Sequence, residues 1–200
     1  GPIRQGPQVV LATIPVPVDV EHEPRALAGA RLHGEARELL QGGEGRAVAP
    51  DEGGQVGVLV LAHDGDLGPT VGDVTGNAEK VRRARDEAAR LGAEIVAFPE
   101  LFIAGYPPED LVLKPAFQAA CRSAVEALAR ETKTGPALLV GTPWVEDGKL
   151  YNAYAHLAGG VIAALRYKVD LPNYGVFDEK RVFTPGPMPG PILFNGVRLG

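Results

Sequence analysis

The fold is decided by a stretch near the centre of the chain, residues 93–111, AEIVAFPELFIAGYPPEDL. Residues 94–98 are mostly apolar and include two β-branched side chains, a composition that predicts a short buried strand. Pro99 ends this strand because proline has no backbone N–H for the strand ladder. An ionisable residue, Glu100, follows at once. Functional residues of open α/β sheets gather just past the carboxyl ends of strands, so Glu100 is a candidate site residue.

Strand and helix patterns alternate on both sides of this stretch. The predicted elements are, in order, a strand at 56–62, a helix at 77–91, the strand at 94–98, a helix at 115–131, a strand at 137–141, two hairpin strands at 151–158 and 161–168, and a last strand at 194–199. Parallel strands joined by helices predict a layered α/β sheet, to which the antiparallel hairpin is added.

The first quarter of the chain differs in composition from the rest. Residues 1–55 contain no aromatic residue, whereas all twelve aromatic residues lie between Phe98 and Phe194. The same segment holds nine glycines and six prolines. Such a segment buries too little apolar surface to offset the loss of chain entropy. We therefore predict that residues 1–55 are disordered or loosely attached, and that residues 56–200 form the folded domain.

The overall composition excludes several classes of protein. The formal net charge of −5 argues against a nucleic-acid partner, which requires a basic face. A single cysteine excludes a disulfide framework and a multi-cysteine zinc site, and the histidines lie too far apart for a short metal motif, so no metal is expected. The apolar runs are too short to span a membrane. We expect a cytoplasmic protein that binds neither nucleic acid nor membrane.

Three residues are candidates for chemistry on pattern alone. Glu100 and Lys168 each follow a predicted strand, but a solvated loop acid and an edge-strand lysine that prevents aggregation are the commoner explanations. Cys121, the only thiol, lies in the middle of the helix at 115–131, on its apolar stripe. A free cysteine in that position behaves as a small hydrophobic residue, so we do not expect it to be a nucleophile.

Five blocks of sequence carry more specific information than the pattern of strands and helices. They are PTVGD at 69–73, FPELFIAGYPPEDL at 98–111, VGTP at 140–143, LYNA at 150–153 and KVDLPNYGVFDEKR at 168–181. In this order the blocks resemble the nitrilase superfamily and, within it, the glutaminase domains of bacterial glutamine-dependent NAD+ synthetases. The resemblance implies an αββα sandwich, of which the chain would hold an incomplete part.

The same resemblance implies roles for individual residues. The family uses a Glu-Lys-Cys triad, whose general base maps onto Glu100 and whose lysine maps onto Lys168. The carboxylate would take the proton of the attacking thiol and later give it to departing ammonia, while the ammonium stabilises the oxyanion. Tyr174 and Tyr106 match tyrosines of the pocket for L-glutamine, and Glu179 is a candidate supporting carboxylate.

The resemblance also implies parts that the 200 residues do not contain. The family's nucleophilic cysteine lies a few residues beyond the strand equivalent to 195–200, and an ATP-dependent synthetase domain follows it. We therefore expect the chain alone to be inactive and to bind no cofactor. The synthetase domain would be the partner of this chain and would bind ATP and Mg²⁺. The resemblance also implies that the whole enzyme is a homo-oligomer. A free-standing carbon–nitrogen hydrolase acting as an amidase, or a non-catalytic nitrilase-fold binding module, are the alternatives.

Overall fold

In a computed structural model of the chain, the structure describes residues 46–47, 58–60, 68–90, 92–175, 177–195 and 197–199. The segment predicted to be disordered or loosely attached, residues 1–55, lies outside these ranges except for two residues. These two residues, Arg46–Ala47, form the short strand β1. The prediction for the remainder of the segment stays a prediction.

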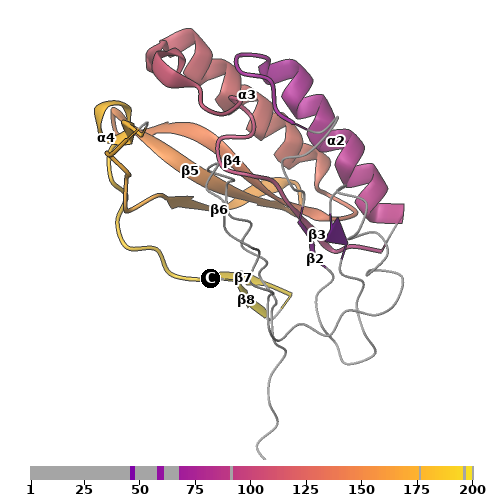
Figure 1. Ribbon diagram of the computed structural model, residues 1–200. Helices are drawn as coiled ribbons and strands as arrows, with labels where there is room; N and C mark the ends of the chain where they lie inside the picture. The colour runs from indigo at the N-terminus through magenta and orange to yellow at the C-terminus, as the bar shows by residue number, and fades with distance from the viewer. Residues whose placement is uncertain are drawn as a thin grey trace, which may run out of the picture.

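The centre of the fold is a six-stranded sheet in which the strands follow one another in sequence order (Figure 1). The strands are β1 (Arg46–Ala47), β2 (Val58–Val60), β3 (Ile95–Ala97), β4 (Ala137–Glu146), β5 (Lys149–Ala158) and β6 (Val161–Tyr167). The pairs β2–β3 and β3–β4 are parallel, and β1, β5 and β6 each pair antiparallel with a neighbour. The predicted sheet with an added antiparallel hairpin is thus confirmed.

Two long helices form a layer over one face of this sheet (Figure 1). They are α2 (Val74–Arg90) and α3 (Pro115–Glu131), and the short 3₁₀-helix η2 (Glu109–Leu113) precedes α3. Helix α3 has the predicted bounds, and it starts at a proline, which suits the first turn of a helix. Helix α2 begins three residues earlier than predicted because the Asp73 carboxylate caps it, accepting the N–H of Gly76 at 2.9 Å.

The main hydrophobic core lies between the helices and the sheet. Alternate residues of the strands point toward the helices, as the two-residue period of a strand requires. The buried side chains of this core include Val81, Ala88, Val96, Cys121, Val125, Leu128, Leu138, Val140, Trp144, Ala153, Ala155 and Leu157. The apolar stripe predicted for the helix at 115–131 is therefore the surface that packs on the sheet, and α2 contributes Val81 and Ala88 to the same core.

A second, smaller cluster covers part of the opposite face of the sheet. It joins Ile95, Ala97, Ala137 and Leu139 of the sheet to Ile192 and Leu199. The last two residues belong to β7 (Ile192–Phe194) and β8 (Val197–Leu199), a hairpin on the side away from the helices (Figure 1). Layers on both faces of a mixed sheet make this an α/β fold.

The prediction of one continuous strand at 194–199 was wrong. Phe194 pairs with Val197 across a two-residue turn, and Asn195 has a positive φ of 47°. The sequence at this turn, Asn195-Gly196, is the strongest short signal for a β-hairpin, because both residues tolerate positive φ. The chain therefore reverses where we expected it to run straight.

The strand predicted at 137–141 is longer in the structure. It continues as β4 to Glu146 and returns as β5 from Lys149, so that Asp147 and Gly148 form the turn. Both turn residues have positive φ, at 49° and 71°, which fits the preference of Asp-Gly for tight hairpin turns. The extension matters because it creates the long β4–β5–β6 surface on which the charged residues described below lie.

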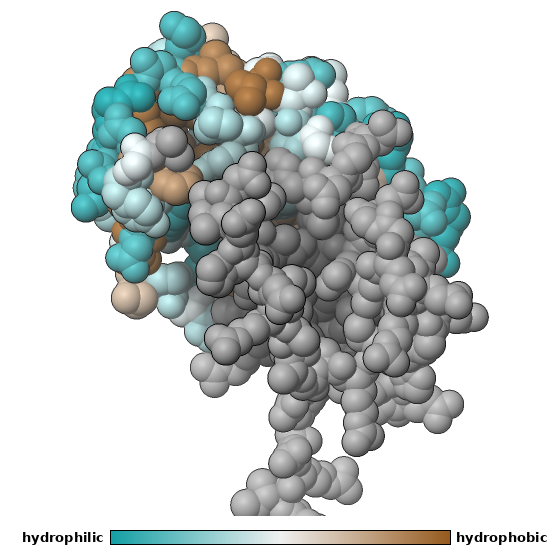
Figure 2. Space-filling model, viewed as in Figure 1, coloured by the Kyte–Doolittle hydropathy of each residue, from teal (hydrophilic) through white to brown (hydrophobic). Residues whose placement is uncertain are grey.

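Most of the described surface in the view of Figure 2 is hydrophilic, with small hydrophobic patches. Partly exposed charged pairs of the protein include Arg82 with Glu131, 2.9 Å apart, which joins α2 to α3. In the part of the chain that the structure describes, no helix has the length and hydrophobicity that crossing a bilayer would require.

One buried residue predicts how stability depends on pH. His156 on β5 is buried against Phe194, and within the described residues neither ring nitrogen has a hydrogen-bond partner. Burial, together with the charge of Arg166, lowers the pKa of His156. Below the ordinary histidine pKa of about 6.5, the unfolded chain therefore binds a proton that the folded chain resists. Stability should fall as the pH drops below this value.

Urea unfolding of the chain at pH 7.5 and pH 5 measures this effect, with the fluorescence of Trp144, the chain's single tryptophan, as the signal. His156→Leu should reduce the difference between the two pH values. An equal pH dependence in both proteins would mean that other groups cause it.

Candidate active site

Three charged side chains, far apart in sequence, meet at one end of the sheet. The ammonium Nζ of Lys168 donates to Glu100 Oε1 at 2.7 Å and to Glu179 Oε1 at 2.8 Å. Glu100 lies in the loop after β3, Lys168 directly follows β6, and Glu179 is the first residue of the short helix α4 (Glu179–Val182). Two carboxylates against one ammonium leave this cluster with a net negative charge.

Strand register explains why these groups lie together. Ala153 and Ala155 of β5 belong to the core on the helix side, so the side chains of Asn152 and Tyr154 point to the other face. The backbone N–H of Lys168 donates to the carbonyl of Asn152 at 2.8 Å, which continues the β5–β6 pairing by one residue. The cluster therefore lies on the sheet face that the helices leave open.

The loop that carries Glu100 crosses β4 at a glycine. A Cβ atom on Gly141 would lie only 2.4 Å from the backbone nitrogen of Leu101 and 2.5 Å from the carbonyl oxygen of Pro99. The loop is also fixed by the Tyr154 hydroxyl, which donates to the carbonyl of Phe98 at 2.9 Å. Only glycine permits such a close backbone approach, and this approach sets the position of Glu100.

This contact predicts the effect of a small substitution. Gly141→Ala should destabilise the chain by about 1–3 kcal/mol, because the new methyl group meets backbone that cannot rotate away. A shift of Glu100 by about 1 Å would also lower any hydrolytic activity that depends on it by roughly 100-fold. Urea unfolding of the chain measures the first effect, and amide hydrolysis by the full-length protein measures the second. Gly190→Ala is the matched control, since a Cβ there meets no atom within 4 Å; similar losses in both variants would contradict this explanation.

The environment keeps Lys168 protonated. Partial burial lowers the pKa of Lys168, but its hydrogen bonds to Glu100 and Glu179 and the charges of these carboxylates outweigh burial, so that the pKa is raised. The side chains of Lys168 and Glu100 are 29% and 38% exposed, and that of Glu179 only 10%. Solvent and small ligands can thus reach the first two groups, while Glu179 supports the ammonium from the protein side.

The two tyrosines predicted to line a glutamine pocket lie in different surroundings. Burial, followed by the negative charges of Glu100 and Glu179, raises the pKa of Tyr106, so its hydroxyl lies within the field of the cluster. Tyr174 is 71% exposed and has a ring contact with Phe177, with ring centres 5.7 Å apart. The structure therefore brings Glu100, Lys168 and Glu179 into contact, Tyr106 is near enough for their charges to act on its pKa, and Tyr174 is largely exposed to solvent. The pocket role of both tyrosines remains a prediction.

Sequence reasoning missed one residue of the cluster. The side-chain amide of Asn152 donates from Nδ2 to Glu100 Oε1, the same oxygen that accepts from Lys168. Asn152 lies in the LYNA block, but only the pairing of β5 with its neighbours shows where it points. A polar residue within a mostly apolar predicted strand was the available signal, because a polar side chain that becomes buried requires a partner.

The only cysteine is remote from this cluster. Cys121 is fully buried in α3, within the core on the helix side of the sheet, and burial raises the pKa of its thiol to about 12. A neutral thiol on the helix side of the sheet cannot attack a ligand near Glu100, which lies on the other side. The prediction that Cys121 is a core residue is confirmed.

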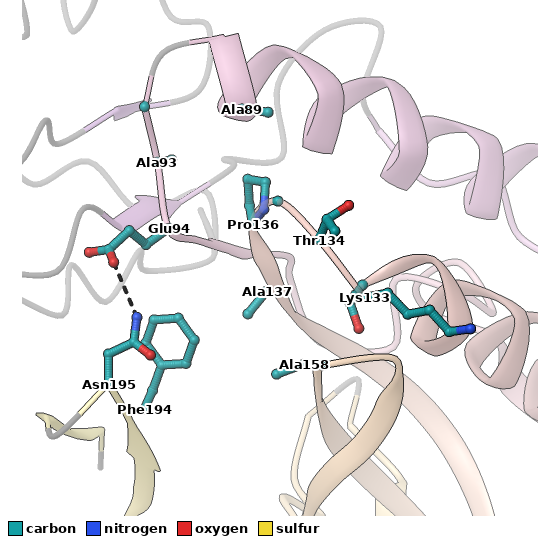
Figure 3. A pocket seen from close by; sticks show the side chains of 14 residues that line it. Ala89, Ala93, Glu94, Lys133, Thr134, Pro136, Ala137, Ala158, Phe194 and Asn195 are labelled. Atoms are coloured by element: carbon teal, nitrogen blue, oxygen red, sulfur yellow. Dashed lines mark hydrogen bonds between the residues drawn. The ribbon is translucent and has the colours of Figure 1, made fainter.

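A separate cleft of about 540 Å³ lies at the opposite ends of the central strands (Figure 3). Its lining includes Glu94, just before β3, and Ala137, the first residue of β4, whereas Glu100 follows the carboxyl end of β3. Glu94 Oε1 accepts from Asn195 Nδ2 across this cleft at 3.1 Å (Figure 3). No group of three or more metal-binding side chains occurs among the described residues, in this cleft or elsewhere.

Comparison with known sequences identifies the family. Residues 61–200 match the family model described as carbon-nitrogen hydrolase. The chain therefore belongs to the carbon-nitrogen hydrolase family.

Within this family, the chain is similar to a particular kind of enzyme. It is 44% identical over 134 residues to the glutamine-dependent NAD(+) synthetase of Rhodobacter capsulatus, a match covering 67% of this chain and 24% of that protein. It is also 44% identical over 131 residues to the enzyme of the same name from Aquifex aeolicus, covering 65% and 23%. The chain spans about a quarter of the length of these curated relatives.

Solved structures show the same relationship. The glutamine-dependent NAD+ synthetase of Acinetobacter baumannii, in complex with ADP, matches with a TM-score of 0.61 and 33% identity, covering 65% of this chain and 24% of that one. A mutant of an amidase of the nitrilase superfamily from Nesterenkonia matches with a TM-score of 0.55 and 29% identity, covering 70% and 51%. The nitrilase-like fold and the resemblance inferred from the five sequence blocks are thus confirmed.

Proposed function

We propose that this chain is part of the glutamine amidohydrolase domain of a glutamine-dependent NAD+ synthetase. The whole enzyme would hydrolyse L-glutamine and use the ammonia for the ATP-dependent amidation of deamido-NAD+. The observation that carries the proposal is the ion pair of Glu100 with Lys168, at 2.7 Å, in a chain 44% identical to such synthetases. ATP and Mg²⁺ would bind to the synthetase domain, and no residue of the present chain is assigned to them.

Glu100 would act as the general base. Its carboxylate would accept the proton of a cysteine thiol as the thiolate sulfur bonds to the side-chain carbonyl carbon of glutamine. When the tetrahedral intermediate collapses, the C–N bond breaks and the same proton leaves with ammonia. Water then attacks the thioester, Glu100 takes its proton, and glutamate and the free thiol are released.

The thiol in this reaction cannot be Cys121, which is buried on the helix side of the sheet. A related structure supports a cysteine nucleophile: in a mutant of the Nesterenkonia amidase, acrylamide has added to the active-site cysteine. We therefore assign the nucleophile to a cysteine outside residues 1–200.

Lys168 would stabilise the oxyanion of the tetrahedral intermediate. Its ammonium is held between Glu100 and Glu179 and is partly exposed, so it can turn one N–H toward a ligand without leaving its partners. A fixed cation that is already in place costs no reorganisation when the negative charge develops. Glu179 would hold Lys168 in position, while Tyr106 and Tyr174 would contact the bound glutamine.

The test uses the full-length protein encoded by the complete reading frame to which this chain belongs. We expect it to release ammonia from L-glutamine and to form NAD+ from deamido-NAD+ and ATP with either glutamine or ammonium as the nitrogen source. We also expect a homo-oligomeric enzyme of the cytoplasm. Cys121→Ser should leave both activities unchanged, and the isolated 200-residue chain should release no ammonia.

Other outcomes would favour the two alternatives. Hydrolysis of simple aliphatic amides without NAD+ formation would indicate an amidase. Glutamine binding without turnover would indicate a binding module. Loss of glutaminase activity in Cys121→Ser would contradict the assignment of the nucleophile to another cysteine.

A further inference from the structure

The position of Asn152 gives it a defined task at Glu100. We infer that Asn152 is a positioning residue, which directs Glu100 so that one chosen oxygen, Oε2, is free to accept a proton. The inference rests on the proposed function, because it concerns the general base of that reaction.

The hydrogen bonds of Glu100 are unequal. Oε1 accepts from the Asn152 amide and from the Lys168 ammonium, whereas Oε2 accepts from no group among the described residues. The site is open enough for this oxygen to meet a ligand, since the Glu100 side chain is 38% exposed. The carboxylate is thus fixed through one oxygen and available through the other.

The two donors also leave only one oxygen of Glu100 open to a proton. An ammonium group has no acceptor, and the amide presents its NH₂ group, so both partners act as donors and both donate to Oε1. The orientation of the amide follows from the same chemistry, because its own carbonyl oxygen would repel Oε1. A proton that reaches Glu100 must therefore bind to Oε2, the oxygen from which it can be passed on.

Asn152 is itself held firmly. It is only 4% exposed, it lies within β5 opposite Pro143 of β4, and its carbonyl accepts the N–H of Lys168. One residue thus holds the backbone of Lys168 and the carboxylate of Glu100 in a fixed relation. Lys168 thus places a positive charge beside Glu100, and Asn152 fixes the orientation of the Glu100 carboxylate.

The experiment compares two variants of similar size in the full-length protein. Asn152→Leu removes the donor at every pH. Asn152→Asp also removes it at high pH, but the introduced carboxyl can donate again when it is protonated. Thr142→Val, a buried polar position on the helix side of the neighbouring strand β4, is the matched control. The measured quantity is kcat for ammonia release from L-glutamine between pH 5 and pH 9, relative to the wild type.

We expect different pH profiles from the two variants. Asn152→Leu should lose about 10- to 100-fold in kcat with little change in KM, the usual cost of a lost hydrogen bond to a charged group. Its deficit should be the same across the pH range, because leucine cannot donate at any pH. The deficit of Asn152→Asp should instead be largest at high pH, where two carboxylates face each other. Thr142→Val should follow the wild-type profile.

Two results would overturn the inference. One is a deficit in Asn152→Asp that does not change with pH, because a purely structural role would scale activity equally at all pH values. The other is the same change in Thr142→Val. Ammonium-dependent NAD+ formation, measured in parallel, shows that each variant is folded.

Failure of the proposed function would be seen separately, in a wild-type protein that does not hydrolyse glutamine. The orientation of the Glu100 carboxylate in crystal structures of the full-length wild type and of Asn152→Leu then provides the test. The inference requires that the carboxylate turn away from its wild-type orientation in the variant, and an unchanged orientation would overturn it.

Discussion

Glu100→Gln should lower glutamine-driven NAD+ formation by the full-length protein by about 10²- to 10⁴-fold, the usual contribution of general-base assistance. The substitution keeps the size of the side chain, and the amide oxygen can still accept from Lys168 and Asn152. What it removes is Oε2, which would be replaced by an NH₂ group that cannot take a proton from a thiol. The loss should therefore fall on kcat, with a much smaller change in the KM for glutamine.

Two controls separate loss of chemistry from loss of structure. Added ammonium should restore NAD+ formation in Glu100→Gln, because the synthetase reaction does not use the glutaminase site. Glu87→Gln, which removes an exposed carboxylate from an ion pair on α2, should behave like the wild type. If Glu100→Gln stayed inactive with ammonium supplied, Glu100 would be maintaining the fold and the proposed role would be wrong.

The elements predicted correctly from the sequence are those with strong local signals. Helix α3 has the predicted bounds because a proline marks its start and an apolar stripe continues through Leu128. The strands missed or shortened in the prediction depend on turns. Asp147-Gly148 lengthens the β4–β5 hairpin and Asn195-Gly196 folds back the end of the chain, and both turns rely on positive φ that apolar periodicity does not reveal.

The candidate site was also predictable in part, because two of its residues lie in local sequence signals. Glu100 and Lys168 each follow a strand, and the resemblance to a known family assigned them one reaction. Their 2.7 Å contact spans 68 positions of sequence and follows from the pairing of β4, β5 and β6. Asn152 was missed because its role depends wholly on that register: a shift of one residue would turn its amide into the helix-side core.

The second large effect is expected from Lys168→Met, which keeps most of the length of the side chain but removes its charge. Glutamine hydrolysis should fall by about 10²- to 10³-fold, the usual loss when one donor to an oxyanion is removed. The loss should again be in kcat, and ammonium should again restore NAD+ formation.

This variant should differ from Glu100→Gln in one further respect. Lys168 is the only partner that the described residues offer to the Glu179 side chain, whose second oxygen, Oε2, is buried without a hydrogen-bond partner. Lys168→Met leaves that carboxylate with neither a cation nor a donor, and an uncompensated buried charge destabilises a protein strongly. Thermal stability should therefore fall together with activity. The loss of activity could then be mistaken for a result of the lower stability.

The double variant Lys168→Met/Glu179→Gln separates the two effects. Replacing the Glu179 carboxylate with a neutral amide removes the unpaired charge, so the double variant should recover much of the thermal stability that Lys168→Met loses. It should recover none of the glutaminase activity, because the ammonium that faces the oxyanion is still missing. Recovery of activity along with stability would show that Lys168 only holds Glu179 in place, and that another group stabilises the reaction's negative charge.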